Sequence, residues 1–113
     1  MVLTDLSLTP VLVHWVIYDV PGTATGLPAH VENVYAPSSV AGAHQTDGYD
    51  NQTRGYLGPC PPMMTTHTYQ FTVYSLDTAM LPGLSASSTR PDAVAAIQTH
   101  RLGSGTLTGT FGR

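Results

Sequence analysis

A histidine that follows a rigid loop is the first feature of this sequence that could bind an anion. His67 comes shortly after the segment Gly-Tyr-Leu-Gly-Pro-Cys-Pro-Pro at residues 55–62, here called the Gly-Pro wall. Its prolines fix φ, and Gly55 and Gly58 permit backbone conformations or close approaches that a side chain would forbid. Such a segment suits the wall of a pocket, with His67 facing a ligand held there. A tight turn that feeds an ordinary strand explains the same spacing equally well.

A second histidine, His14, interrupts the apolar run from Val11 to Tyr18. A buried neutral imidazole needs hydrogen-bond partners for both ring nitrogens, and a carboxylate is the partner that would best hold one N–H. Asp5 is the nearest carboxylate upstream. The alternative is a core histidine whose partners are backbone groups.

Two enzymatic interpretations use the same residues. Asp5, His14 and His67 have the residue types of a two-histidine, one-carboxylate metal site. Cys60 could be a nucleophile activated by His67, although a cysteine between prolines also suits simple packing. Neither arrangement has a local motif such as His-Glu-x-x-His. We therefore expect a binding protein rather than an enzyme, with no metal and no cofactor.

Three segments have the composition of strands that could position these groups. Residues 11–18 are β-branched and aromatic with apolar side chains on both faces, which predicts a central strand covered on two sides. Residues 67–76 alternate with period two, and residues 106–111 predict a short closing strand. Residues 22–58 are rich in glycine, proline and small polar residues, which indicates a functional loop region that holds short strands.

One helix is predicted over residues 91–102. Pro91 suits its first turn, Thr89 its N-cap and Gly103 its end. Val94, Ile97 and Leu102 would pack against the sheet. The other histidines, His30, His44 and His100, have no evident partners and are interpreted as surface or helix-end residues.

The bulk composition narrows the function classes. The 113 residues match one ordinary domain, and only 10% are charged, against about 25% in typical soluble domains. The chain has no lysine and a net charge of −3, which argues against nucleic-acid binding. A single cysteine forms no internal disulfide, and no apolar run approaches the roughly 20 residues of a membrane span. With nothing resembling a signal peptide, we expect a cytoplasmic protein.

Several of these segments, in this order, are similar to the successive signatures of the phosphatidylethanolamine-binding protein family. They are His14-Trp15-Val16-Ile17-Tyr18 with Pro21, the Gly-Pro wall, and His67-Thr68-Tyr69 running into the strand to Leu76. The bacterial and archaeal, Raf-kinase-inhibitor-like branch resembles this chain most, including the ending from Leu107 to Arg113. The resemblance implies a mainly-β fold over residues 1–113, with a central antiparallel sheet packed by a smaller sheet and one C-terminal helix.

The resemblance also implies a surface pocket for phosphate-like anions or phospholipid headgroups. Matched by position, its lining residues are Asp5, His14, Gly58, Pro61, Pro62, His67 and Tyr69. Asp5 would orient a histidine or meet a ligand amine, and the histidines would donate to anionic oxygens, more strongly when protonated. A kinase or protease partner, regulated through the pocket rim, is the alternative role that the family implies.

The amino-terminal part departs from the family pattern. The family's Asp-Pro-Asp-x-Pro motif corresponds here to Asp5-Leu6-Ser7-Leu8-Thr9-Pro10, and the family's usual preceding segment is absent from this sequence. We therefore expect an uncovered sheet edge that favours self-association, with a homodimer as its simplest form.

Overall fold

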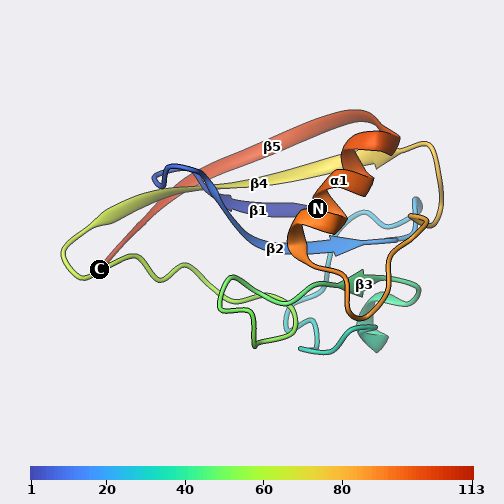
Figure 1. The fold of residues 1–113 in the computed structure, drawn as a ribbon, viewed down its shortest axis with the longest axis horizontal. Helices are drawn as coiled ribbons and strands as arrows, with labels where there is room; N and C mark the ends of the chain where they lie inside the picture. The colour runs from blue at the N-terminus through green and yellow to red at the C-terminus, as the bar shows by residue number, and fades with distance from the viewer.

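The computed structural model describes residues 1–113 and consists mainly of one antiparallel sheet. Its strands are β1 (Val2–Asp5), β2 (Leu12–Tyr18), β3 (His44–Gln45), β4 (Thr66–Leu76) and β5 (Arg101–Gly112), in the spatial order β3-β2-β1-β4-β5 (Figure 1). The helices are α1 (Arg90–His100) and the 3₁₀ turn η1 (Ser38–Val40). The predicted mainly-β fold with one C-terminal helix is confirmed.

β2 contributes to a core on each face of the sheet, as its doubly apolar pattern predicts. On one face Val16 and Tyr18 pack with Ala93 and Ile97 of α1. On the other face Trp15 and Ile17 pack with residues of the loop region, among them Val40. Because neighbouring side chains of a strand point to opposite faces, one apolar run serves both clusters.

The loop region between β2 and β4 forms the layer opposite α1 and contains little regular structure. Besides η1 it holds β3, which pairs with Ile17 and Tyr18 of β2, and one isolated bridge between Asp47 and Arg54. The smaller sheet implied by the family resemblance is therefore reduced to these short pairings. Repeated glycines and prolines interrupt every longer extended run in this region.

The helix begins where the sequence predicts but ends earlier. Thr89 accepts a hydrogen bond from the Asp92 N–H, and the Asp92 carboxylate accepts one from the Thr89 N–H, forming a capping box. The helix ends at His100, and β5 begins at Arg101, so Leu102 is 72% exposed instead of packing on the sheet. Residues from Arg101 onward pair with β4, in a register that runs from Leu76↔Arg101 to Thr66↔Gly112. This pairing favours an extended conformation over another helical turn.

β4 and β5 extend beyond the other strands, so the molecule tapers to one end (Figure 1). The C-terminus lies at this end, beside the loop that leads into β4. β5 is the outermost strand, and all of its residues are exposed. No helix has the length and apolar character needed to cross a membrane.

Candidate functional site

Asp5, which is buried, and His67, which is partly buried, form a pair at the end of β1. The Asp5 Oδ2 atom lies 2.6 Å from His67 Nδ1, and the Asp5 Oδ1 atom accepts a hydrogen bond from the Ser7 N–H at 2.9 Å. Antiparallel pairing of β1 with β4 places Asp5 opposite Tyr69, which brings His67 within reach. Asp5 is 2% exposed, so its carboxylate is fixed by these contacts. The sequence offered Asp5 as the nearest carboxylate for His14, with backbone partners as the alternative. The structure pairs Asp5 with His67 instead, so the histidine that Asp5 orients is His67.

His14 lies beside this pair because β2 is irregular at that point. The register with β1 runs from Leu3↔Trp15 to Thr4↔Val13, so His14 is the extra residue of a β-bulge. Val13 packs with the helix-side core, whereas the His14 ring lies 5.3 Å from the Tyr69 ring on the opposite face. Strict alternation would have placed His14 on the helix side, so the bulge is what directs it into the site.

Two buried polar atoms in this cluster have no hydrogen-bond partner. They are Nδ1 of His14 and Oη of Tyr69, in residues that are 3% and 5% exposed. Buried polar groups are rarely left in this state, because each loses its hydrogen bonds to water without compensation. The Asp5 carboxylate and the Leu57 backbone lie near enough to Tyr69 and His14, respectively, to raise their pKa values, but neither forms a hydrogen bond of normal geometry with the two atoms.

Burial determines the protonation of the aromatic groups in the site. It lowers the pKa of His14 from its ordinary value of 6.5, against the opposing effect of the nearby Asp5 carboxylate. Burial, followed by Asp5, raises the pKa of Tyr69. His14 is therefore mainly neutral and Tyr69 a neutral hydroxyl donor at pH 7.

Tyr49 is a further member of the site that the sequence reasoning missed. Its ring centroid lies 4.3 Å from that of His14, and burial raises its pKa. Tyr49 belongs to the irregular loop region, where no periodic pattern marks a residue for the core. Only the fold of that loop places it over β2.

The Gly-Pro wall is held against the sheet by contacts on both of its sides. Gly55 has φ +95°, and a Cβ there would lie 2.9 Å from the Gln45 side-chain amide, so a larger residue does not fit. Tyr56 packs edge-on against Trp15, with ring centroids 5.4 Å apart. Glycine is less strictly required at Gly58, where the nearest atom to a Cβ would be 3.7 Å away. Of the predicted wall prolines, Pro61 is buried and Pro62 exposed.

Cys60 and His67, which the enzymatic interpretations use, contact other side chains in the structure. Cys60 is exposed, and its Sγ atom accepts a hydrogen bond from Arg113 Nη1 at 3.1 Å, while His67 Nδ1 is paired with Asp5. No group of three His, Cys, Asp or Glu side chains is placed to hold a metal ion. Around Asp5 and His67 the structure thus places aromatic side chains, His14 and Tyr69 among them.

Two histidines outside the site have partners that the sequence did not indicate. His44 Nδ1 lies 2.9 Å from Asp19 Oδ2, and His100 Nδ1 lies 2.7 Å from Asp77 Oδ1. Both carboxylates are more than 20 residues away in sequence. The structure thus corrects the interpretation that His44 and His100 lack partners, whereas His100 does lie at the end of a helix, α1.

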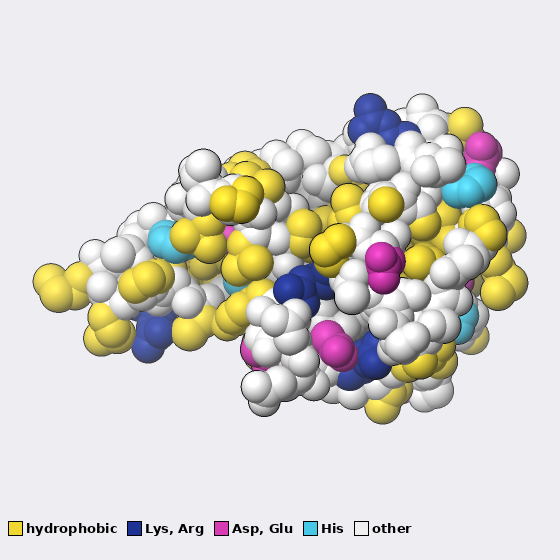
Figure 2. All heavy atoms as spheres, viewed as in Figure 1, with side chains coloured by type: hydrophobic (Ala, Val, Ile, Leu, Met, Phe, Trp, Pro, Cys, Tyr) yellow, Lys and Arg dark blue, Asp and Glu magenta, His cyan; other side chains and the backbone are white.

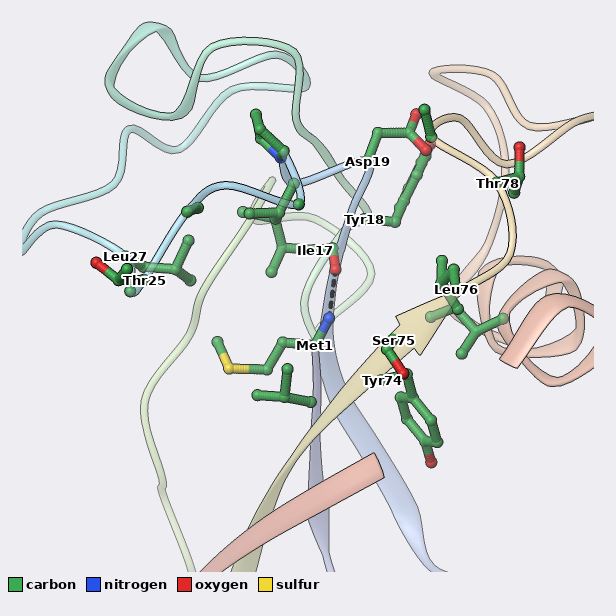
Figure 3. Close-up of a pocket in the computed structure, with 18 of the residues that line it drawn as sticks. Met1, Ile17, Tyr18, Asp19, Thr25, Leu27, Tyr74, Ser75, Leu76 and Thr78 are labelled. Carbon is green, nitrogen blue, oxygen red and sulfur yellow. Dashed lines mark hydrogen bonds between the residues drawn. The ribbon is translucent and has the colours of Figure 1, made fainter. Parts of the chain in front are cut away.

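A cavity of about 750 Å³ lies at the other end of β1 and β2, away from the cluster (Figure 3). Its lining includes Ile17, Leu27 and Leu76, and the Met1 amine donates a hydrogen bond to the Ile17 carbonyl at its floor. None of the predicted site residues lines it. We therefore take the Asp5–His67 cluster, and not this cavity, as the candidate site.

The sequence of this chain is similar to a family profile and to the sequences of several known proteins. A family profile described as "Phosphatidylethanolamine-binding protein" matches residues 3–112. The chain is 36% identical to a UPF0098 protein of Methanothermobacter thermautotrophicus over 102 residues, which cover 88% of this chain and 62% of the relative. It is also 36% identical over 100 residues to the putative lipoprotein LppC of Mycobacterium tuberculosis, covering 45% of that protein. The chain thus spans about half to two thirds of these relatives' lengths.

Solved structures share the fold. Escherichia coli YbcL, described as a new member of the mammalian PEBP family, superimposes with a TM-score of 0.85 at 23% identity, covering 99% of this chain and 69% of YbcL. A putative PEBP homologue, CT736 of Chlamydia trachomatis, gives a TM-score of 0.76 at 22% identity with the same coverage.

Proposed function

Since the chain belongs to the phosphatidylethanolamine-binding protein family, we propose that it is a non-enzymatic protein that binds a phosphate-like anion, such as a phospholipid headgroup. The binding site comprises the Asp5–His67 pair, His14 and Tyr69, with the Gly-Pro wall beside them. The observation that carries this proposal is the presence of two unpartnered buried polar atoms, His14 Nδ1 and Tyr69 Oη, next to an oriented histidine. An anion with several acceptor oxygens would satisfy the Tyr69 hydroxyl, and also His14 Nδ1 in the tautomer that carries the proton on this atom.

Each side chain has a distinct role in this proposal. Asp5 holds the Nδ1–H of His67, which leaves Nε2 of that ring for the ligand, where a protonated imidazole donates a charge-assisted hydrogen bond. Tyr69 donates through its hydroxyl. Asp5 already accepts from His67 and from the Ser7 N–H, which favours the orienting role over direct contact with a ligand amine.

The direct test is a titration with inorganic phosphate and with phosphoethanolamine, followed by NMR of the histidine side chains. We expect saturable shifts at His14 and His67. His30, His44 and His100 lie outside the site, so their chemical shifts should not change and serve as internal controls. If neither His14 nor His67 responds to either anion, the proposal is wrong.

A matched pair of variants tests the unpartnered hydroxyl. Tyr69→Phe removes a donor without changing the ring, so we expect phosphate binding to weaken by about three- to tenfold, as for the loss of one hydrogen bond. The free protein should keep its stability, because a buried unsatisfied group is removed. Tyr74→Phe is the control, since the Tyr74 hydroxyl contacts Gln98 outside the site.

Exposed methionines beside the site favour a second candidate, the binding of a kinase or protease through the rim. Met63 and Met64 are 70% and 93% exposed in the loop that leads to β4, and hydrophobic side chains gather at the tapered end of the molecule (Figure 2). Methionine-rich surfaces suit adaptable protein contacts. A pull-down with wild type, His67→Ala and Met64→Ser should then lose the same partner with both variants; identical partner sets would contradict this role.

A further inference from the structure

The four arginines carry all of the fixed positive charge of this lysine-free chain, and three of them are committed elsewhere. Arg54 is paired with Asp47 and also donates to main-chain oxygens. Arg90 donates to the main-chain oxygens of residues 47 and 48, and Arg101 to the Gln98 side chain. Arg113 differs from these because its side chain reaches the Gly-Pro wall.

Pairing at the end of β5 fixes the position of Arg113. Its N–H donates to the Thr65 carbonyl at 3.1 Å, and its own main-chain oxygen accepts from the Met64 N–H at 2.9 Å. These bonds lie next to Thr66↔Gly112, the last pair of the β4–β5 register. The residue therefore joins the loop before His67 to the C-terminal strand.

From this position, the guanidinium of Arg113 contacts the Gly-Pro wall. Nη1 donates to Cys60 Sγ at 3.1 Å and to the Pro61 carbonyl at 3.3 Å. The other guanidinium nitrogens, Nε and Nη2, have no partner in the structure. Arg113 is exposed, and no carboxylate forms a salt bridge with it.

The other charges near the candidate site are paired with a carboxylate or donate to main-chain oxygens. His67 faces the Asp5 carboxylate, so this pair has no net positive charge even when the imidazole is protonated. Asp5 is the only carboxylate that affects the pKa of His14, and the charge of Arg90 lowers that pKa. Tyr49, Tyr69, Cys60 and Asp50, whose charge raises the pKa of Tyr49, are the other titratable groups near the site. An anion bound there would therefore gain most from a cation at the wall.

We propose that Arg113 is the fixed cation of the anion pocket, and that its free Nε and Nη2 donors bind the oxygens of the bound phosphate group. This assignment rests on the proposed function. The guanidinium matches phosphate because its donors are planar and paired, and its charge does not depend on pH in the physiological range. Arg113 would then be a specificity-determining residue for doubly charged phosphate groups.

The test compares variants of Arg113 with a variant of Arg101 that removes the same charge far from the wall. Dissociation constants for inorganic phosphate are measured at pH 7.5 for wild type, Arg113→Gln, Arg113→Lys and Arg101→Gln. We expect Arg113→Gln to weaken binding by about tenfold or more, as for a lost charge-assisted hydrogen bond. Arg113→Lys keeps the charge but lacks the paired donors, so its affinity should lie between those of wild type and Arg113→Gln. Arg101→Gln should bind as wild type does.

A purely structural role for Arg113 predicts a different pattern. If Arg113→Lys binds phosphate as weakly as Arg113→Gln does, binding depends on the shape of the side chain and not on its charge, and the charge assignment is wrong. Equal binding by Arg113→Gln and Arg101→Gln also overturns it. The histidine spectra of the free variants verify that His14 and His67 keep their environments. Failure of the wild type itself to bind phosphate would instead reject the proposed function, and this assignment with it.

Discussion

At the scale of single residues, the candidate site combines an oriented imidazole with unsatisfied donors. Asp5 and His67 are 62 residues apart in sequence, yet their side chains form the shortest contact of the cluster. Asp5 also holds the turn after β1 through the Ser7 N–H. A buried carboxylate with two such contacts affects both the local fold and the geometry of the site.

Replacing Asp5 by alanine should therefore destabilise the protein. His67 Nδ1 and the Ser7 N–H would both lose their acceptor, at an expected cost of about 1–3 kcal/mol. Urea denaturation measures the change. Asp77→Ala is the matched control, because the Asp77–His100 pair is exposed and such pairs contribute at most about 1 kcal/mol. Equal losses in the two variants would contradict the structural role of Asp5.

His14 should make stability depend on pH. Burial lowers its pKa below 6.5, so the unfolded chain binds a proton more readily than the folded one, and stability is fully present above pH 6.5. As pH falls through this value, protonation should favour unfolding until the folded pKa is passed. Thermal melts from pH 8 to pH 5 should show a smaller loss for His14→Gln than for wild type. His30→Gln, an exposed change, is the control, and identical profiles for His14→Gln and wild type would refute the expectation.

At the scale of elements, the site depends on how the Gly-Pro wall is attached to the sheet. Gln45 of β3 is fully buried, and its side chain accepts from Trp15 Nε1 and donates to the carbonyls of Glu32 and Val34. Gly55 lies directly against this amide. A single side chain thus connects β2, the loop region and the start of the wall.

Gly55→Ala should loosen the wall. A Cβ at φ +95° is strained and would lie 2.9 Å from the Gln45 amide, so we expect a loss of more than about 1 kcal/mol and weaker phosphate binding. Gly26→Ala is the control, since a Cβ at that position meets no atom within 4 Å. Denaturation and the phosphate titration measure the two effects. If Gly55→Ala is as stable as Gly26→Ala, the wall accommodates the added Cβ and the expectation is wrong.

At the scale of the whole molecule, β5 leaves one side of the sheet open. All of its residues are exposed, and Leu107 and Phe111 lie opposite Phe71 and His67 of β4. The strand contains neither lysine nor proline, which are the residues that commonly protect such edges. The open edge is therefore a surface on which a second strand could pair.

We expect this edge to cause self-association that increases with protein concentration. Leu107→Lys places a charge on the outer strand and should shift the protein towards monomer. Sedimentation at several concentrations measures the equilibrium. Met80→Lys, at a residue that is 65% exposed outside the sheet, is the control with the same added charge. Monomeric wild type at every concentration would contradict the expectation.

Local patterns in the sequence were sufficient to predict the main helix and strands. The apolar run of β2, the alternation of β4 and the Thr89–Pro91 start of α1 are determined by neighbouring residues, and all three are present where expected. The ordered resemblance to the family added the mainly-β fold and the set of side chains to consider. The end of α1 was predicted less well, because long-range pairing of β5 with β4 decides it.

The arrangement of the site was decided only by tertiary structure. The bulge in β2 changes the face of His14, so no alternating pattern could predict its contact with Tyr69. Asp5 meets His67 and not His14 because β1 pairs with β4, and Arg113 reaches Cys60 because β5 ends beside the wall. Sequence by itself determined which side chains could bind an anion; strand pairing over long separations decided which of them lie together, because register and bulges depend on the partner strand.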